Sequence, residues 1–334
     1  MPAGEKSSLE STLVERKITS LLNEKELQAL REELESAGIR SDVTEAIVGY
    51  AVPSLELSVA TSVTVPVGAT KVGGIPDLPK GALWPRRSDR VRRHPMEPVL
   101  GAIPLAFIAQ VNLAEVAEAL PADENPLPAS GLLSFFYDAY DQPWGYDPED
   151  RPDFRVIYSE SAESLVPTMP PEDLPEICRF THQAVSLDRK PSLLSDRSDE
   201  LYDLGLTDEE HERYFERYWN LTFSDARRIN PFHQLLGHPH AVQNANMEVE
   251  CQLVSHGIPL EAYWELIRVG SDLPTHIAAL VESAKDSWRL LLQLDSNSEL
   301  DMLWSDTGML YFWVTERGLR EKDFNDVWVV VQTT

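Results

Sequence analysis

Polar side chains at the ends of two apolar runs are the residues best placed to do chemistry. Gln110 and Asn112 lie at the end of the run at 105–111, and Gln293 and Asp295 end the run at 289–294. A ligand pocket or a hydrolase site needs polar groups that converge. Trp304 and Asp306, which follow the second run in the sequence, complete the candidate ligand-binding set: Gln110, Asn112, Gln293, Asp295, Trp304 and Asp306.

The two glutamines allow two interpretations, because a buried amide must find hydrogen-bond partners. In the first, Gln110 and Gln293 line one polar cleft together with Asn112 and Asp295. In the second, each amide hydrogen-bonds a neighbouring Gly-x-Pro turn and stabilises the fold. The sequence favours neither.

A second group of polar residues is an acidic loop at 138–153 that also carries aromatic side chains. Carboxylates beside aromatic rings are typical of sugar-binding and glycosidase clefts, although spacing along a loop defines no catalytic pair. We expect an exposed loop that contacts a partner. The candidate partner-binding residues are Asp138, Tyr140, Asp141, Trp144, Tyr146 and Asp147.

Two other clusters carry weaker signals. His233, His238 and His240 have side chains that can bind zinc or another transition metal. Histidines in turns are more often structural, so we predict no metal site and no cofactor. The arginines at 86–93 could bind a phosphate or an acidic peptide, but we expect a loop that offsets the surrounding acidity.

No established catalytic signature occurs in the chain. There is no Gly-x-Ser-x-Gly elbow and no Gly-x-x-x-x-Gly-Lys phosphate loop, and Gly73-Gly74 lacks the third glycine of a dinucleotide-binding turn. These absences favour a protein that is not an enzyme.

Composition narrows the classes of partner. The 334 residues carry a formal net charge of −26, which disfavours nucleic acid and anionic membranes and favours a basic partner protein. Neither a signal peptide nor an apolar stretch long enough to span a membrane is readable. Cys178 and Cys251 show no metal-binding spacing, which fits a reducing compartment. We expect a soluble, cytoplasmic protein.

The pattern of apolar residues predicts the elements that position these groups. Leucines at helical spacing predict a helical segment over 1–50. Apolar runs and alternation predict strands at 55–59, 62–65, 105–111, 131–137, 154–158, 289–294, 309–314 and 327–332. Helices are expected at 114–120, 207–219, 247–255 and 260–267. The fold class is therefore α+β, with mixed or antiparallel sheets.

A repeated order of motifs predicts an internal duplication. A Gly-x-Pro turn, an apolar run ending in Gln, and a Gly followed by an aromatic run occur in that order twice. The turns are Gly74-Ile75-Pro76 and Gly237-His238-Pro239. We place one domain at 51–334, with related halves at 51–166 and 176–334. Four prolines within 167–175 make this stretch the linker between them.

Four segments of the chain are distinctive: Gly-Gly-x-Pro-x-Leu-Pro-x-Gly-x-x-Trp-Pro at 73–85, Phe-Ile-Ala-Gln-Val-Asn-Leu at 107–113, His-Gln-Leu-Leu-Gly-His-Pro at 233–239 and Leu-Trp-Ser-Asp-Thr-Gly at 303–308. Together they resemble the YwqG-like family. The resemblance covers roughly 55–331, and residues 86–94 look like an insertion. It implies an α+β bacterial domain of unknown function without established catalytic residues. Relatives in toxin and immunity gene neighbourhoods imply protein binding.

These observations lead to one main hypothesis and one alternative. The main hypothesis is a non-enzymatic, cytosolic protein-binding module, immunity-like in role, that uses loops at the junction of the halves. The alternative is a small-ligand-binding protein or hydrolase with a polar cleft between the halves.

Overall fold

The computed structural model describes residues 21–60, 65–88, 101–161, 164–222 and 231–333, with backbone alone at 219–222. The first 20 residues of the expected N-terminal helical segment lie outside this range, as does most of the strand expected at 62–65. Arg90, Arg92 and Arg93 of the basic cluster are likewise outside it.

Ten strands form one large sheet in the order β12-β11-β10-β9-β1-β8-β2-β4-β5-β6. In chain order they are β1 (Val52–Val59), β2 (Lys71–Val72), β4 (Ala106–Asn112), β5 (Leu132–Tyr137), β6 (Phe154–Ser159), β8 (Gln183–Ser192), β9 (Gln234–Leu235), β10 (Trp288–Asp295), β11 (Met309–Thr315) and β12 (Val327–Gln332). Strands β3 (Asp77–Pro79) and β7 (Leu165–Pro167) pair separately. Every described pairing is antiparallel, so the α+β class is confirmed and the sheet is not mixed.

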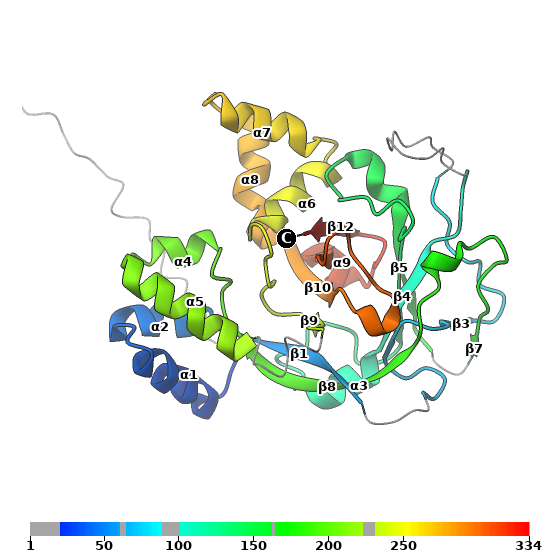
Figure 1. Cartoon of the computed structure of the whole chain (residues 1–334), viewed down its shortest axis with the longest axis horizontal. Helices are drawn as coiled ribbons and strands as arrows, with labels where there is room; N and C mark the ends of the chain where they lie inside the picture. Colours follow the sequence, from blue (N-terminus) through cyan, green and yellow to red (C-terminus); the bar gives the residue numbers. More distant parts are fainter. Residues whose placement is uncertain (1–20, 61–64, 89–100, 162–163, 223–230, 334) are drawn as a thin grey trace, which may run out of the picture.

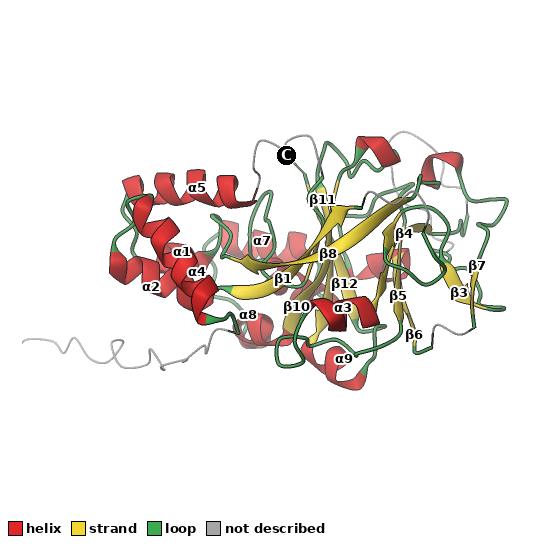
Figure 2. Cartoon of the chain, turned by 90° about the horizontal axis from the view of Figure 1, so that it is seen from below, coloured by secondary structure: helices red, strands yellow, loops and turns green. Residues whose placement is uncertain are grey.

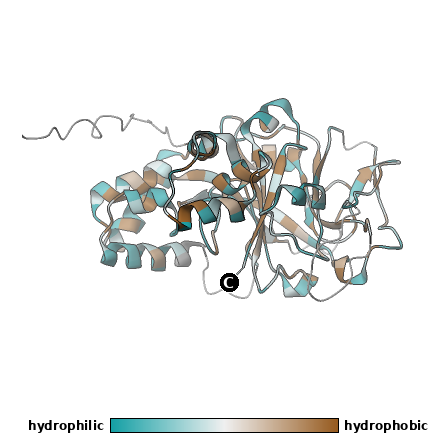
Figure 3. Ribbon diagram, turned by 90° about the horizontal axis from the view of Figure 1, so that it is seen from above, coloured by the Kyte–Doolittle hydropathy of each residue, from teal (hydrophilic) through white to brown (hydrophobic). Residues whose placement is uncertain are grey.

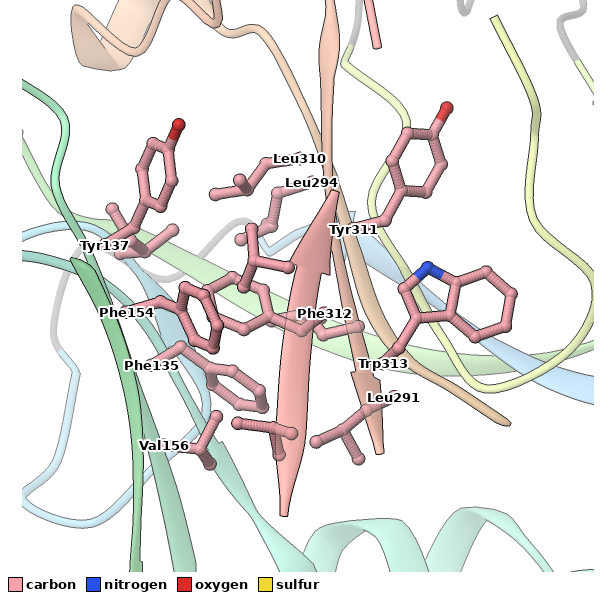
Figure 4. Packing of buried hydrophobic residues seen from close by; sticks show 14 of the residues in the cluster. Phe135, Tyr137, Phe154, Val156, Leu291, Leu294, Leu310, Tyr311, Phe312 and Trp313 are labelled. Carbon is pink, nitrogen blue, oxygen red and sulfur yellow. The ribbon is translucent and has the colours of Figure 1, made fainter. Parts of the chain in front are cut away.

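The sheet is strongly curved, so that its two ends face each other across the core. Phe135 of β5 meets Phe312 of β11 edge to face, with ring centroids 5.1 Å apart (Figure 4). Phe154 of β6 and Trp328 of β12 make a similar contact at 5.3 Å. Edge-to-face aromatic contacts add stability beyond the burial of apolar area. The main hydrophobic core therefore lies inside the curve. Figure 3 shows hydrophobic residues, coloured brown, along the strands of the sheet.

The centre of the sheet is the long ladder between β1 and β8, which runs from Val52↔Ser192 to Val59↔Val185. It separates five strands on one side, β12 to β1, from five on the other, β8 to β6. Figure 2 shows β1 and β8 side by side across the middle of the molecule. The proline-rich residues 168–175 contain no helix or strand and connect β7 to the 3-10 helix η2 (Glu176–Cys178).

One helical group packs beside the sheet around its own hydrophobic cluster (Figure 1). It contains α1 (Glu24–Ser36), α2 (Ser41–Tyr50), α4 (Asp199–Asp203) and α5 (Asp208–Thr222). Asn23 and Glu26 form a capping box that begins α1. The side chains of Leu34 and Ile47 are fully buried in this cluster, and the Tyr214 hydroxyl donates to the Leu194 carbonyl at 2.7 Å.

A second helical group covers the end of the sheet that carries β10 and β12. It contains α6 (Met247–Ser255), α7 (Leu260–Arg268) and α8 (Thr275–Ser287). Trp288 fixes α6 to β10, because its Nε1–H donates to the Gln252 side chain at 2.7 Å. Helix α7 buries only Leu260 and projects from the body in Figure 1. Short helices α3 (Leu113–Ala119), α9 (Glu316–Glu321), η1 (Pro148–Asp153) and η3 (Ser298–Leu300) complete the fold.

No helix among the described residues is both long enough and apolar enough to cross a membrane.

Candidate functional site

Gln110 fixes the turn that contains the first Gly-x-Pro motif. Its Oε1 accepts from the Asp77 N–H at 2.9 Å, and its Nε2 donates to the Ala69 carbonyl at 2.8 Å and to the Asp77 carboxylate at 2.6 Å. The same carboxylate oxygen also accepts from the ammonium group of Lys71 at 3.0 Å and from the Gly68 N–H at 2.9 Å. The buried amide is thus fully engaged within the fold.

Gln293 holds the second Gly-x-Pro turn in a similar way. Its Oε1 accepts from the His240 N–H at 2.8 Å. Gln234 supports the same turn, because its Nε2 donates to the carbonyls of Leu236 and His238 at 2.7 and 2.9 Å.

Gln110 and Gln293 share no hydrogen-bond partner among the described residues. They lie on β4 and β10, and strands β2, β8, β1 and β9 stand between these two in the sheet. Asn112 caps α3 and donates to the Gly68 carbonyl at 2.8 Å, so it lies near Gln110.

The other three members of the set lie near the end of β10. Asp295 accepts from the Phe232 N–H at 3.0 Å, and burial raises the pKa of its carboxyl to about 6. Trp304 is buried and its Nε1–H donates to the Asp295 carbonyl at 3.3 Å, whereas Asp306 is exposed.

The three histidines make separate contacts. His233 Nδ1 accepts from the Asp295 N–H at 3.1 Å, and burial lowers the pKa of His233 to about 4. His238 Nε2 lies 2.8 Å from the Tyr50 carbonyl, and His240 Nδ1 lies 2.7 Å from the Tyr218 hydroxyl. Within the described residues, no group of three or more His, Cys, Asp or Glu side chains could hold a metal ion.

The described part of the basic cluster pairs with acidic residues. Arg86 forms a bidentate ion pair with Asp173, in which Nη1 donates to Oδ2 at 2.6 Å and Nη2 donates to Oδ1 at 2.9 Å. Arg87 is buried and forms ion pairs with both Asp138, at 2.9 Å, and Asp141. Asp138 also accepts from the Tyr140 and Asp141 N–H groups through its second oxygen, so it is a structural residue of the loop.

The predicted partner-binding loop and helix α7 together form an open cleft of about 700 Å³. Four of the six predicted residues line it, namely Asp141, Trp144, Tyr146 and Asp147, whereas Asp138 and Tyr140 do not. The rest of the lining is Gln142, Pro143, Asp150, Pro259, Glu261 and Trp264. We call this the aromatic cleft.

Three rings form the wall of the aromatic cleft. The ring centroids of Tyr146 and Trp264 lie 5.1 Å apart, and their planes make an angle of 87°. The ring centroids of Tyr146 and Trp144 lie 5.8 Å apart, with an angle of 59° between the planes. Trp144 and Trp264 remain 40% and 42% exposed, which is unusual for rings of this size. The aromatic cleft therefore presents apolar area to solvent.

Contacts with β12 hold the loop in place. The Val331 N–H donates to the Trp144 carbonyl at 3.2 Å, and the Trp328 Nε1–H donates to the Gly145 carbonyl at 2.8 Å. Gly145 has a φ of +78°, and a Cβ there would lie 1.7 Å from the Val329 carbonyl oxygen. Only glycine fits this approach. On the other side, the Leu260 N–H donates to the Tyr146 carbonyl at 3.0 Å and so fixes the start of α7.

The aromatic cleft is acidic. Its lining contains Asp141, Asp147, Asp150 and Glu261 and, within the described part of the chain, no Lys, Arg or His. Behind it, burial and the Glu250 carboxylate raise the pKa of Tyr146, so the phenol ring stays neutral. Burial also raises the pKa of Glu250 from 4.5 to about 7.

Sequence reasoning missed Trp264 and Glu261 of α7. The helix itself was predicted at 260–267. The signal that could have identified Trp264 is that a large aromatic residue lies on this helix away from its buried residue, Leu260. The place of Trp264 and Glu261 beside Tyr146 depends on a contact between segments far apart in the chain.

The chain combines a curved ten-stranded antiparallel sheet with two groups of helices, and an open cleft walled by aromatic rings lies between a strand-to-strand loop and a helix. The family model described as a domain of unknown function (DUF1963) matches residues 70–333, and the chain belongs to this family. A comparison with curated proteins gives no significant match.

Replacing Gln110 by Leu should lower the free energy of unfolding by about 2 to 4 kcal/mol, because the buried Asp77 N–H and Ala69 carbonyl lose their partner. Equilibrium denaturation in urea measures the change. The matched control is Gln28→Leu on the exposed face of α1, with an expected change below about 0.5 kcal/mol. Equal effects of the two substitutions would contradict the assigned role of Gln110.

Replacing Glu250 by Gln should stabilise the protein at pH 8 by about 3 kcal/mol and leave it nearly unchanged at pH 4. The pKa of Glu250 is raised from 4.5 to about 7 on folding, so as pH rises the unfolded state loses its proton first. The free energy of unfolding therefore falls as the pH rises from 4.5 to about 7. The uncharged amide of the Glu250→Gln variant does not titrate, so this fall is absent in the variant. Thermal unfolding as a function of pH measures it, with exposed Glu282→Gln as control. A pH-independent effect of Glu250→Gln would refute the assignment.

Proposed function

We propose that this protein is a non-enzymatic, cytosolic module that binds a basic segment of another protein in the aromatic cleft. The observation that carries the proposal is that a loop rich in acids and aromatic residues forms, with α7, an open cleft walled by Trp144, Tyr146 and Trp264. Trp and Tyr dominate the energetics of protein interfaces, because they bury large areas at a small entropic cost.

Exposed apolar side chains beside the aromatic cleft support an interface on α7. Ile267 and Val269 are more than half exposed and lie at the end of the helix that carries Trp264. Contiguous exposed apolar area rimmed by polar groups marks interaction surfaces. The partner would therefore contact both the aromatic cleft and the end of α7.

Charge supports a basic partner. The chain carries a net charge of −26, and the aromatic cleft is lined by acidic side chains. A field of this sign steers a cationic surface toward the protein and speeds association.

The aromatic cleft also lies at a junction, which supports binding through loops where two halves meet. Its loop follows β5, while the groups that hold it come from β12 and α7. We propose that residues 51–166 and 176–334 are duplicated halves. Corresponding contacts support this: the Gly73 N–H donates to the Ile108 carbonyl at 2.7 Å, and the Leu236 N–H donates to the Leu291 carbonyl at 3.2 Å.

Further matches support the duplication. Gln110 and Gln293 both accept from the residue that follows a Gly-x-Pro motif, and each follows a register shift in its strand. The strand order supports the duplication as well. Going outward from the β1–β8 pair, β9, β10, β11 and β12 on one side correspond to β2, β4, β5 and β6 on the other.

We further propose that the chain is YwqG-like within its family, and that its role is immunity-like, with a toxin as the partner.

A second candidate function is supported by a smaller cavity. It has a volume of about 290 Å³ and lies between α1 and the strands β1, β8 and β9, where the proposed halves meet. Its lining includes Glu56, Lys190, Gln234 and His240, so polar groups of both charges face it. This supports a small-ligand-binding protein or hydrolase with a cleft between the halves, although no catalytic group is assigned.

The double substitution Trp144→Ala and Trp264→Ala should weaken partner binding at least tenfold, because the exposed rings supply the main apolar contacts. Binding is measured by capture of the stoichiometric partner from native lysate at low salt, followed by titration. The control is Tyr202→Ala with Phe215→Ala, which removes two similarly exposed rings outside the aromatic cleft. Undiminished binding by the cleft variant would refute the proposal.

The pair Asp147→Asn and Glu261→Gln should slow association with the captured partner and flatten its dependence on salt. Glu212→Gln with Glu216→Gln on exposed positions of α5 changes the net charge equally and serves as control. Stopped-flow association rates at several salt concentrations measure the difference. If both pairs change the rates equally, the field of the whole protein and not the aromatic cleft guides the partner.

A further inference from the structure

The walls of the aromatic cleft form a corner and not a flat platform. The planes of Tyr146 and Trp264 stand at 87°, and Trp144 is inclined to Tyr146 by 59°. A flat guanidinium group stacks best parallel to one ring. A rounded cation instead contacts the faces of several rings at once, as in the aromatic cages that bind quaternary ammonium groups.

Most carboxylates of the lining already accept hydrogen bonds from the protein. Asp141 pairs with Arg87, and Asp147 Oδ1 accepts from the Glu149 N–H at 2.8 Å. Asp150 Oδ2 accepts from the Gly145 N–H at 3.1 Å. These groups supply negative charge but have reduced capacity to receive further N–H donors. The arrangement favours a cation that carries no N–H group, because such a cation loses no hydrogen bond to water when it enters.

We propose that the aromatic cleft holds a quaternary ammonium group, carried on a trimethylated lysine side chain of the partner protein. Tyr146 and Trp264 form two walls of the corner, Trp144 adds the third ring, and the acidic lining supplies the attractive field. The volume of about 700 Å³ exceeds what the head group needs and leaves room for the methylene stem and the backbone that bears it. This inference rests on the proposed function only in placing the cation on a protein.

The test compares ligands that differ in charge or methylation alone. The probes are a short peptide with one trimethyl-lysine, the same peptide with lysine, choline, and 3,3-dimethylbutan-1-ol, which is the neutral carbon analogue of choline. Isothermal titration on the full chain should show the trimethyl-lysine peptide binding at least fivefold more tightly than the lysine peptide. Choline should bind at least tenfold more tightly than its neutral analogue, and more weakly than the trimethyl-lysine peptide.

Substitutions in the aromatic cleft locate the binding. Trp264→Ala should abolish the preference for the methylated peptide, while Trp264→Phe should retain part of it, because a smaller ring still presents a face. The thermal unfolding of each variant verifies that it is folded. Equal binding of choline and its neutral analogue would overturn the proposal, as would tighter binding of the lysine peptide or of choline than of the trimethyl-lysine peptide. If the preference is absent but the captured partner still requires Trp144 and Trp264, the ammonium site fails while the proposed function stands.

Discussion

The antiparallel ladder between β1 and β8 is the interaction on which the rest of the structure depends. Among the described strand pairings, it is the one that joins the five strands from β12 to β1 to the five from β8 to β6. Because the sheet curves about this ladder, Phe135 and Phe312 meet inside the core, and the loop after β5 reaches β12. The aromatic cleft exists only while that ladder holds the two sides together, so its stability is tied to the whole fold.

Buried polar groups do structural work in this protein. Gln110 and Gln293 resemble site residues in the sequence, yet each holds a turn against its own strand. An amide at such a position satisfies buried backbone groups that would otherwise cost free energy. The groups that line the aromatic cleft are instead rings and acids on the loop and on α7, and the proposed binding of a cation rests on them.

The sequence predicted the elements whose pattern is local. The buried runs that became β4, β5, β11 and β12 were placed to within about two residues, and α6 was predicted with its observed bounds. Strand β8 was missed because it is polar, half exposed and contains Pro191. It forms only because β1 and β2 pair with it on both sides. Tertiary pairing of this kind overrides local propensity.

The same limit applies to the aromatic cleft. The loop was recognised from its composition. The buried ion pair between Asp138 and Arg87 and the contact of Trp264 with Tyr146, however, join residues that are far apart in the sequence. No local pattern encodes them. Helix α5 was expected at 207–219, but its packing with α1 and α2 around one hydrophobic cluster is a long-range contact of the same kind. Helix α8 was not predicted.

The most direct test of the account uses fluorine NMR of protein in which all eight tryptophans are replaced by 5-fluorotryptophan. The Trp144 and Trp264 resonances are assigned with Trp→Phe variants and followed while the captured partner is added. The account predicts that these two resonances shift or broaden until binding saturates, while that of the buried Trp313, which does not line the aromatic cleft, stays in place. Saturable binding of the partner that leaves the Trp144 and Trp264 resonances unchanged would contradict the claim that the aromatic cleft is the working surface.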